Sequence, residues 1–366
     1  MTEPVSVAAE APADWDALAV DRPGGHVYQS RGWAEHRRSS GWRPRFLSVG
    51  DQRILALTRP WPLIGGGSAY LPKGPAPVVA GEELGAALWA ATEALAADRI
   101  DVVASDAEVP AADAAYASWL RRARYRPIEE IHPARHRMSL PLGADADEES
   151  VFKEIAKATR QRIRQAEKEG TVVARHDARA AGSDGPGEGF APPGEPAAAA
   201  LDRFYDLLLA TGERLDFTFG PRQEYVAWWR AALAAGHLVY LRARAADGTE
   251  LAGLVLYRHG GRLTTVHSGD RADVRKAHPG ALHLLRWRAI QLAIREGCRE
   301  MDLGGVDVPG ARREPRLGDP MYGLYQHKQS FGARWLQLTG AHERVIRPHR
   351  YLAGRAVSRA LRLVRR

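Results

Sequence analysis

The sequence predicts an α/β protein made of two tandem α+β modules, each built around a mixed sheet. Its 366 residues exceed the size of one typical core, so two domains are expected. The hydrophobic share of 45% and the charged share of 26% are those of a globular protein. The third observation is the most informative, because one order of elements (helix, hairpin, strand, helix, strand) occurs twice along the chain.

The first copy begins where Gln29 or Ser30 can cap a helix that carries Trp33 and ends near Gly41. The pair Gly50-Asp51 marks the turn of a hairpin. The elements predicted after the helix are strands at 44–49, 54–59 and 64–71, a helix at 82–97, a strand at 100–105, a helix at 111–123 and a strand at 137–142.

The second copy begins with a helix at 223–235 that carries Trp228 and Trp229 and ends at Gly236. Asp247-Gly248 is a strong hairpin signal. The elements predicted after the helix are strands at 237–243, 251–257 and 262–268, a helix at 280–296 and a strand at 301–303. We therefore expect a first domain at 1–145, completed by residues 336–366, and a second domain at 146–335.

A basic helix is predicted between the copies, over residues 148–168, with Val151, Ile155, Ile163 and Ala166 as its apolar positions. Its cationic face suits a nucleic-acid backbone, and a solvated charged face is the alternative. The candidate contact residues are Lys153, Lys157, Arg160, Arg164 and Lys168. The segment near 181–197 is rich in Gly, Pro and Glu and predicts a disordered loop.

The last twenty residues predict a second basic helix. Arg355, Arg359 and Arg362 recur every three or four residues, opposite apolar positions such as Leu352 and Leu361. A basic amphipathic helix of this kind suits a peripheral contact with acidic lipid. A polar cap on the first domain is the alternative.

Composition excludes several classes of site. The single cysteine, Cys298, leaves no internal disulfide or cysteine zinc site and fits a reducing cytoplasm. We expect no metal, because Pro133 separates His132 from His136 and spoils a helical ligand pair. We find no signal pattern, no apolar run long enough for a bilayer, and no Walker, Rossmann or nucleophile-elbow motif. The net charge of +8 favours anionic partners.

The stretch 302–335 carries the clearest signs of chemistry. A predicted strand ends at Leu303, and Gly304-Gly305 then lets the backbone pass close to another group. After a polar loop, a short helix at 324–330 carries His327 and Lys328. A strand end, a glycine turn and a lysine next to apolar residues form a candidate active site.

These residues resemble the FemABX family, the aminoacyl-tRNA-dependent peptidyl transferases that build peptidoglycan cross-bridges. The resemblance covers most of the chain and rests on the order of its segments, which read QSRGWAEHRRSSGW, YLPKGPAP, ATRQRIRQAEKEG, TGERLDF, LGGVD and GLYQHKQSFG. It implies two tandem modules like those of the GCN5-related acetyltransferases (GNAT). The insert near residue 190 is short and rich in Gly and Pro, so the chain resembles members without the long coiled-coil arm.

The resemblance also implies roles for particular residues. Arg37 takes the place of a lysine that contacts precursor phosphates in relatives, and Arg214 is the arginine of the T-x-x-R segment. Lys328 is the lysine of the closing motif, whereas His327 replaces the usual phenylalanine. An aspartate once considered a base falls near Asp106.

The expected chemistry is attack of an amine on the ester carbon of an aminoacyl-tRNA. Lys328, beside Gly304 and Gly305, is placed to stabilise the oxyanion, and a surface lysine beside Phe331 is the alternative. His327 can donate a hydrogen bond, tune the lysine or pack.

Arg37 and Arg214 are candidate phosphate clamps, with a solvated helix face as the alternative. Tyr70, Lys73 and Gly74 are expected to line the same groove as these arginines, although Lys73 also suits a solvent-facing turn.

The sequence thus predicts an aminoacyltransferase that needs no cofactor, with aminoacyl-tRNA as its co-substrate. The acceptor is the amine of a peptidoglycan precursor or of a specialised metabolite. We expect a monomer in the cytoplasm, with the carboxy-terminal helix as a membrane contact. A CoA-dependent GNAT N-acyltransferase or a non-catalytic binding module is the alternative, but the Q/R-x-x-G-x-G/A turn that holds the CoA pyrophosphate is missing.

Overall fold

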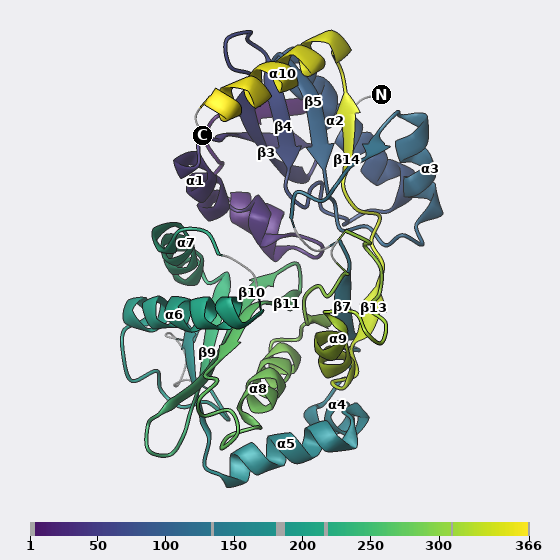
Figure 1. Cartoon of the computed structure of the whole chain (residues 1–366). Helices are drawn as coiled ribbons and strands as arrows, with labels where there is room; N and C mark the ends of the chain where they lie inside the picture. The colour runs from purple at the N-terminus through teal and green to yellow at the C-terminus, as the bar shows by residue number, and fades with distance from the viewer. Residues whose placement is uncertain (1–3, 133–134, 181–186, 216–218, 309, 365–366) are drawn as a thin grey trace. The chain divides into compact units, whose positions relative to one another are not determined.

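Two seven-stranded mixed sheets frame the protein, one in each of two units (Figure 1). The structure, a computed structural model, describes residues 4–132, 135–180, 187–215, 219–308 and 310–364. The first unit comprises residues 1–136 and 336–366, and the second comprises residues 137–335. The strand orders are β1-β2-β3-β4-β5-β14-β6 in the first unit and β13-β7-β12-β11-β10-β9-β8 in the second.

The central strands of the two sheets repeat one pattern of pairing. Two antiparallel pairs are followed by a parallel pair, and one helix, α2 or α8, connects the parallel strands. In the first unit these elements are β2 (Arg43–Val49), β3 (Gln52–Pro60), β4 (Gly67–Leu71), α2 (Gly81–Ala97) and β5 (Ile100–Ser105). In the second they are β9 (Leu238–Arg244), β10 (Glu250–His259), β11 (Arg262–Asp270), α8 (Ala281–Arg295) and β12 (Glu300–Asp302). The predicted fold of two tandem modules is confirmed.

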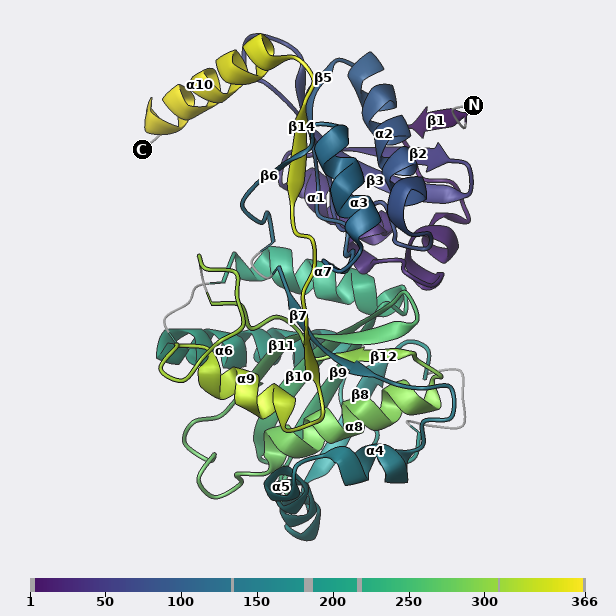
Figure 2. The same ribbon diagram turned by 90° about the vertical axis from the view of Figure 1, so that its right-hand side faces the viewer.

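The remaining elements complete each sheet and cover its faces (Figure 2). The first unit adds β1 (Val5–Ala8), short helical turns at Ala17–Asp21 and Val27–Gln29, α1 (Arg31–Ser39), α3 (Ala114–Arg122), β6 (Arg126–Pro127), β14 (His342–Val345) and α10 (Pro348–Val364). The second adds β7 (Arg137–Pro141), α4 (Glu148–Glu154), α5 (Lys157–Lys168), β8 (Val172–Asp177), α6 (Ala197–Leu215), α7 (Arg222–Ala234), α9 (Tyr322–Gln329) and β13 (Arg334–Leu336). The longest of these helices in the second unit, α6, has 19 residues and packs on the sheet, so the described residues form no long coiled-coil arm.

The boundary between the units differs from the expected one at residue 145. The reason is that β7 pairs with β12, with Leu140 opposite Met301, and so belongs to the second sheet. In the first unit the equivalent place beside β5 is taken by β14, which comes from the end of the chain. Each parallel pair therefore gains an antiparallel neighbour from a segment that follows the other unit in the sequence.

Both faces of the second sheet are buried, which explains its nearly continuous apolar strands. In β9, Val239 and Leu241 belong to the core that includes α8. The ring of Tyr240, on the other face, lies 4.9 Å from that of Phe204 in α6. The alternation of side chains along the strand thus places Val239 and Leu241 against α8 and Tyr240 against α6.

The basic helix predicted over 148–168 is broken into α4 and α5. Ile155 has an extended backbone and a buried side chain, and the N–H of Ala156 donates to the carbonyl of Ser330 at 2.8 Å. The guanidinium of Arg160 donates to the carbonyl oxygens of Ile155, at 2.7 Å, and of Lys153, and so satisfies the end of α4. Apolar periodicity does not distinguish such a break from a continuous helix, because Ile155 is buried in either case.

The segment predicted as a disordered loop lies in part outside the described residues, at 181–186. Beyond it the chain is ordered. Phe190 is buried in the second core, and the N–H of Ala191 donates to the carbonyl of Val173 at 2.8 Å. One aromatic residue thus anchors a stretch whose composition is otherwise that of a flexible loop.

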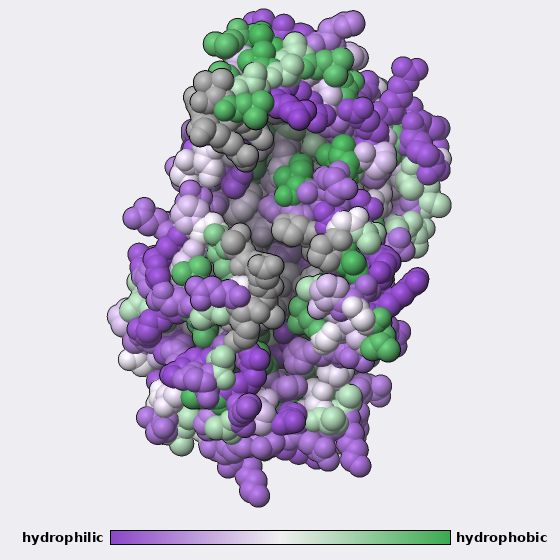
Figure 3. All heavy atoms as spheres, viewed as in Figure 1, coloured by the Kyte–Doolittle hydropathy of each residue, from purple (hydrophilic) through white to green (hydrophobic). Residues whose placement is uncertain are grey.

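Helix α10 is anchored to the first unit by its first turn. The carboxylate of Asp101, which is fully buried, pairs with Arg347 at 3.3 Å and with Arg350 at 3.2 Å and accepts a hydrogen bond from the indole of Trp61. Gly354 lies flat against Trp61, where a Cβ atom would come within 2.3 Å of the ring. The outer face keeps Leu352 exposed, and apolar atoms gather over this helix in Figure 3.

Candidate active site

Helix α9 directs Lys328 into the second unit. The side chain is only 5% exposed, and its Nζ donates to the carbonyl oxygen of Gly305 at 3.1 Å. The end of the helix is fixed by α5, because Thr159 donates through its hydroxyl to that of Ser330 at 2.8 Å. Lys328 is therefore not the solvent-facing lysine of the alternative interpretation.

Position 304, in the turn after β12, requires a glycine. Gly304 has a φ of +80°, and an added Cβ atom would lie 2.8 Å from the carbonyl oxygen of Thr265 and 3.4 Å from Nζ of Lys328. The turn is held by Asp302, whose carboxylate accepts the N–H of Gly304 at 2.7 Å. Gly304, Gly305 and Lys328 thus lie next to one another in the second unit.

The charge of Lys328 is poorly compensated. Burial, together with the charge of Arg286, lowers the pKa of Lys328 to about 7, and Asp302 and Asp307 oppose this shift. Arg286 was not identified from the sequence. The sequence did indicate a buried arginine, because Arg286 lies between Leu285 and Trp287 in a helix that is buried on almost every side.

His327 packs among aromatic rings. Its ring centroid lies 4.8 Å from that of His283 and 5.3 Å from that of Phe331, edge to face in both cases. Burial, followed by the charge of Arg286, shifts the pKa of His327 far below the usual value for histidine. The imidazole is therefore neutral, and packing is the role that its contacts support.

The first unit brings together a second group of predicted residues. The carboxylate of Asp106 accepts the hydroxyl of Tyr70 at 2.9 Å and the backbone N–H of Lys73 at 2.6 Å, and it pairs with Nζ of Lys73 at 3.0 Å. Both side chains of the ion pair are buried. Burial alone would lower the pKa of Lys73, but Asp106, with Glu108 and Glu130, outweighs it and the pKa is raised.

Gly74 and Lys73 lie in a tight turn beside this carboxylate. Lys73 has a φ of +55°, which is unusual for a residue with a side chain. The hydroxyl of Ser105 donates to the carbonyl of Gly74 at 2.6 Å, and Gln29 lies so close that a Cβ atom on Gly74 would come within 2.8 Å of its amide. The turn thus holds Lys73 inward, and the alternative of a solvent-facing turn residue does not apply.

Arg37 lies on α1 beside an aromatic cluster. Its guanidinium is 5.5 Å from the ring centroid of Trp33 and 5.8 Å from that of Trp42. The ring of Tyr28 stacks on Trp33, at 4.3 Å, and on His132, at 4.8 Å, and the rings of Trp33 and His132 lie 6.2 Å apart. His132 was missed from the sequence, because almost a hundred residues separate it from α1 and no local pattern connects them.

The remaining predicted residues have different environments. Lys157, Arg164 and Lys168 are exposed on α5, and Arg164 lies over the ring of Phe152 at 5.4 Å. Lys153 is exposed on α4 and pairs with Glu149 at 2.6 Å, whereas Arg160 caps α4. Arg214 belongs to α6, and its side chain lies outside the described residues.

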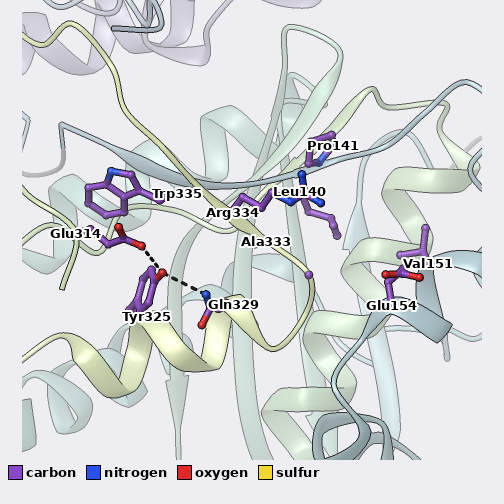
Figure 4. A pocket seen from close by; sticks show the side chains of 11 residues that line it. Leu140, Pro141, Val151, Glu154, Glu314, Tyr325, Gln329, Ala333, Arg334 and Trp335 are labelled. Atoms are coloured by element: carbon purple, nitrogen blue, oxygen red, sulfur yellow. Dashed lines mark hydrogen bonds between the residues drawn. The ribbon is translucent and has the colours of Figure 1, made fainter. Parts of the chain in front are cut away.

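A pocket of about 650 Å³ opens beside α9 (Figure 4). Tyr325 and Gln329 reach it from the helix, and the hydroxyl of Tyr325 donates to Glu314 and accepts from Gln329 at 3.3 Å. The other lining residues are Leu140, Pro141, Val151, Glu154, Gly332, Ala333, Arg334 and Trp335. Lys328 does not line this pocket, which is therefore separate from the lysine site.

Comparison with known proteins identifies the fold. Residues 153–328 match the family model of an acetyltransferase (GNAT) domain. The chain is similar to the crystal structure of FemX, with a TM-score of 0.76 and 17% identity over 95% of this chain and 99% of FemX. The chain has the FemX fold. This confirms the resemblance to the FemABX family at the level of the fold.

A second structure shares this architecture. It is a conserved protein of unknown function from Bacteroides thetaiotaomicron, with a TM-score of 0.55, 12% identity and coverage of 93% of this chain and 99% of that one. No curated protein matches the chain in sequence. The GNAT domain and the FemX fold together support a GNAT-like acyltransferase.

Two further findings concern the described residues. None of their helices combines the length and the apolar character needed to cross a membrane. Within the same residues, no three His, Cys, Asp or Glu side chains are grouped so that they can hold a metal ion.

Proposed function

We propose that the protein is an aminoacyl-tRNA-dependent aminoacyltransferase. It joins the amino acid carried by the tRNA to an amine of a peptidoglycan precursor or of a specialised metabolite. The observation that carries the proposal is Lys328, buried on α9 with its Nζ at the Gly304-Gly305 turn, in a chain with the FemX fold. A cation at this place stabilises the oxyanion that forms when the amine attacks the ester carbonyl.

The packing of α8 favours tRNA over CoA as the carrier of the acyl group. Phosphates bind readily at the N-terminus of a helix. Here Gly280, at the N-cap of α8, packs against α5 so closely that a Cβ atom would lie 2.3 Å from the carbonyl oxygen of Arg162. Helix α5 thus occupies one side of the first turn, and the glycine-rich CoA turn is missing from the sequence.

The donor and the acceptor are assigned to different residues in this proposal. The exposed Lys157, Arg164 and Lys168 of α5 contact the tRNA backbone. In the first unit, Arg37, Tyr70 and Lys73 are assigned to an anionic group of the acceptor. Lys153 and Arg160 contribute less to tRNA binding, because Lys153 already pairs with Glu149 and Arg160 already donates to the carbonyl of Ile155.

The proposal is tested by incubating the protein with charged tRNA and candidate acceptors and analysing the products by mass spectrometry. Parallel reactions contain acetyl-CoA in place of the tRNA, or tRNA digested with RNase before charging. We expect a product whose mass increases by one aminoacyl group, and only with intact charged tRNA. Product from acetyl-CoA, or transfer after RNase digestion, would show that the proposed donor is wrong.

Replacing Arg37 by alanine is expected to weaken acceptor binding. The KM for the acceptor should rise about tenfold or more while kcat changes little, since the guanidinium binds a part of the substrate that does not react. Arg38→Ala, on the same helix, is the matched control, because Arg38 pairs with the exposed Glu10 and Glu35. Equal KM values for both variants would contradict the role of Arg37.

We also propose that α10 contacts acidic lipid when the acceptor is lipid-linked. The helix keeps Leu352 and Leu363 exposed next to Arg355 and Arg359. Cosedimentation with vesicles containing phosphatidylglycerol should exceed that with phosphatidylcholine, and the double variant Arg355→Glu, Arg359→Glu should lose the difference. Equal binding to both kinds of vesicle would leave α10 as a cap of the first unit.

A further inference from the structure

Arg286 is a buried cation without a counter-ion among the described residues. The side chain is on α8 and is only 3% exposed. Its Nε and Nη1 atoms have no hydrogen-bond partner, and the guanidinium carbon lies 5.8 Å from the ring centroid of Phe331. Burying a charge in this way destabilises a protein, so the position calls for a role other than stability.

Arg286 lies beside the lysine site, because the ring of Phe331, 5.8 Å from its guanidinium carbon, also packs against His327 at 5.3 Å. The charge of Arg286 acts on both Lys328 and His327, and His327 in turn touches His283 of α8. Helices α8 and α9 are accordingly neighbours in Figures 1 and 2. A second permanent cation next to a buried lysine disfavours the protonated form of that lysine.

The other groups that face Lys328 do not cancel this effect. Asp302, at the end of β12, and Asp307, in the loop that follows, both favour the protonated lysine. Asp302 is also engaged by the N–H of Gly304, at 2.7 Å, and by Arg137, at 3.9 Å. In the part of the chain that the structure describes, no carboxylate forms an ion pair with Lys328. Burial, together with the charge of Arg286, outweighs these carboxylates and lowers the pKa of Lys328 to about 7.

The chain contains a contrasting buried lysine. Lys73, in the first unit, is nearly as buried as Lys328, but its Nζ lies 3.0 Å from the carboxylate of Asp106 and its pKa is raised. The same fold thus keeps one buried lysine charged by pairing it with an aspartate. At Lys328 the neighbouring element supplies an arginine instead.

We propose that Arg286 is a positioning residue that keeps Lys328 neutral in the resting site, so that Lys328 takes a proton from the ammonium group of the acceptor. The lysine then carries its positive charge when the oxyanion forms. This inference rests on the proposed aminoacyl transfer. Lys328 then acts first as the base, for which the sequence offers no clear candidate, and afterwards as the cation that stabilises the oxyanion.

The protons and bonds of the reaction balance. The neutral amine of Lys328 accepts one proton from the acceptor ammonium, and the free amine attacks the ester carbon of the aminoacyl group. The new C–N bond forms, and the bond from that carbon to the ribose oxygen then breaks. The second amine proton goes to the leaving ribose oxygen. Protonated Lys328 returns its proton to water, so that each turnover releases one proton.

The electrostatic part of the inference is tested by NMR titration, without any substrate. The chain has six lysines, so selective labelling of lysine with ¹³C and ¹⁵N gives few side-chain signals. The signal lost in Lys328→Met identifies Lys328. We expect it to titrate near pH 7, whereas the signal of Lys73 should not titrate below pH 9. A Lys328 midpoint above pH 9 would overturn the inference.

Variants at two positions should shift the midpoint in opposite directions. Arg286→Met removes the cation at similar volume and should raise the midpoint by about one pH unit or more, whereas Arg286→Lys should leave it nearly unchanged. Asp307→Asn should lower it, and this variant also provides the test if Arg286→Met does not fold. A midpoint that is the same in all variants would exclude control by these charges.

The role as a base is tested by the pH dependence of kcat/KM. In the wild type, kcat/KM should rise with pH through the Lys328 midpoint, because only the neutral amine accepts a proton. In Arg286→Met this rise should move to higher pH together with the NMR midpoint. A rise that stays in place while the midpoint moves would refute the role as a base. Absence of transfer from every aminoacyl-tRNA would instead reject the proposed function, whatever the NMR result.

Discussion

Lys328→Met is expected to lower kcat for aminoacyl transfer by about a hundredfold or more. One fixed donor at an oxyanion contributes about 10²–10³ in rate, and the variant also removes the proposed proton acceptor. Methionine has a similar volume, so the loss would not come from a cavity. Single-turnover measurements with saturating aminoacyl-tRNA isolate this step. The control is Lys276→Met, since Lys276 is an exposed lysine of the same unit.

The same variant should be more stable than the wild type, by an amount that depends on pH. The pKa of Lys328 is lowered to about 7 from the ordinary value of 10.5, so between these values the unfolded chain binds one proton more than the folded protein. Wild-type stability therefore rises with pH across this window. The gain in Lys328→Met should be largest below pH 7 and smallest near pH 10.

A kcat within a few fold of the wild type in a folded variant would remove Lys328 from the mechanism.

Asp106→Asn is expected to destabilise the first unit by about 3–5 kcal/mol. The substitution keeps the size of the side chain but leaves the buried ammonium of Lys73 without its counter-ion at 3.0 Å. It also replaces one of the two oxygens that accept from Tyr70 and from the backbone N–H of Lys73. Urea denaturation measures the difference in the free energy of unfolding.

Two further variants separate the buried charge from a general loss of packing. Asp51→Asn breaks an ion pair with Arg22 in which the side chain of Asp51 is 83% exposed. This variant should lower the free energy of unfolding by less than about 1 kcal/mol. Adding Lys73→Met to Asp106→Asn removes the unpaired ammonium and should restore much of the lost stability. If Asp106→Asn costs no more than Asp51→Asn, Asp106 does not compensate a buried charge.

The fold was within reach of the sequence because the information is local and repeated. Trp33 on one helix and Trp228 on another mark the start of two copies, and the turn signals Gly50-Asp51 and Asp247-Gly248 fix the hairpins. Local patterns could not assign β7, because nothing between residues 137 and 141 says which sheet the strand joins. Its pairing with β12 is a long-range choice.

The same distinction applies to the candidate sites. Gly304-Gly305 and Lys328 could be named from the sequence, since a glycine turn after a strand and a lysine in a short predicted helix closed by Phe331 are local signals. The two aspartate clusters that hold α10 and Lys73, around Asp101 and Asp106, depend on residues brought from distant segments. No periodicity predicts which carboxylate an arginine or lysine will reach.

The sequence by itself determined the duplicated α+β architecture, the glycine turn and the identity of the two lysines. Only the tertiary structure decided their charge states. Both Lys73 and Lys328 are buried, and burial alone disfavours the charge on each. Asp106 restores it at Lys73, whereas Arg286 opposes it at Lys328. Electrostatic energies depend on distance and burial in three dimensions, so two lysines that look alike in the sequence acquire opposite properties.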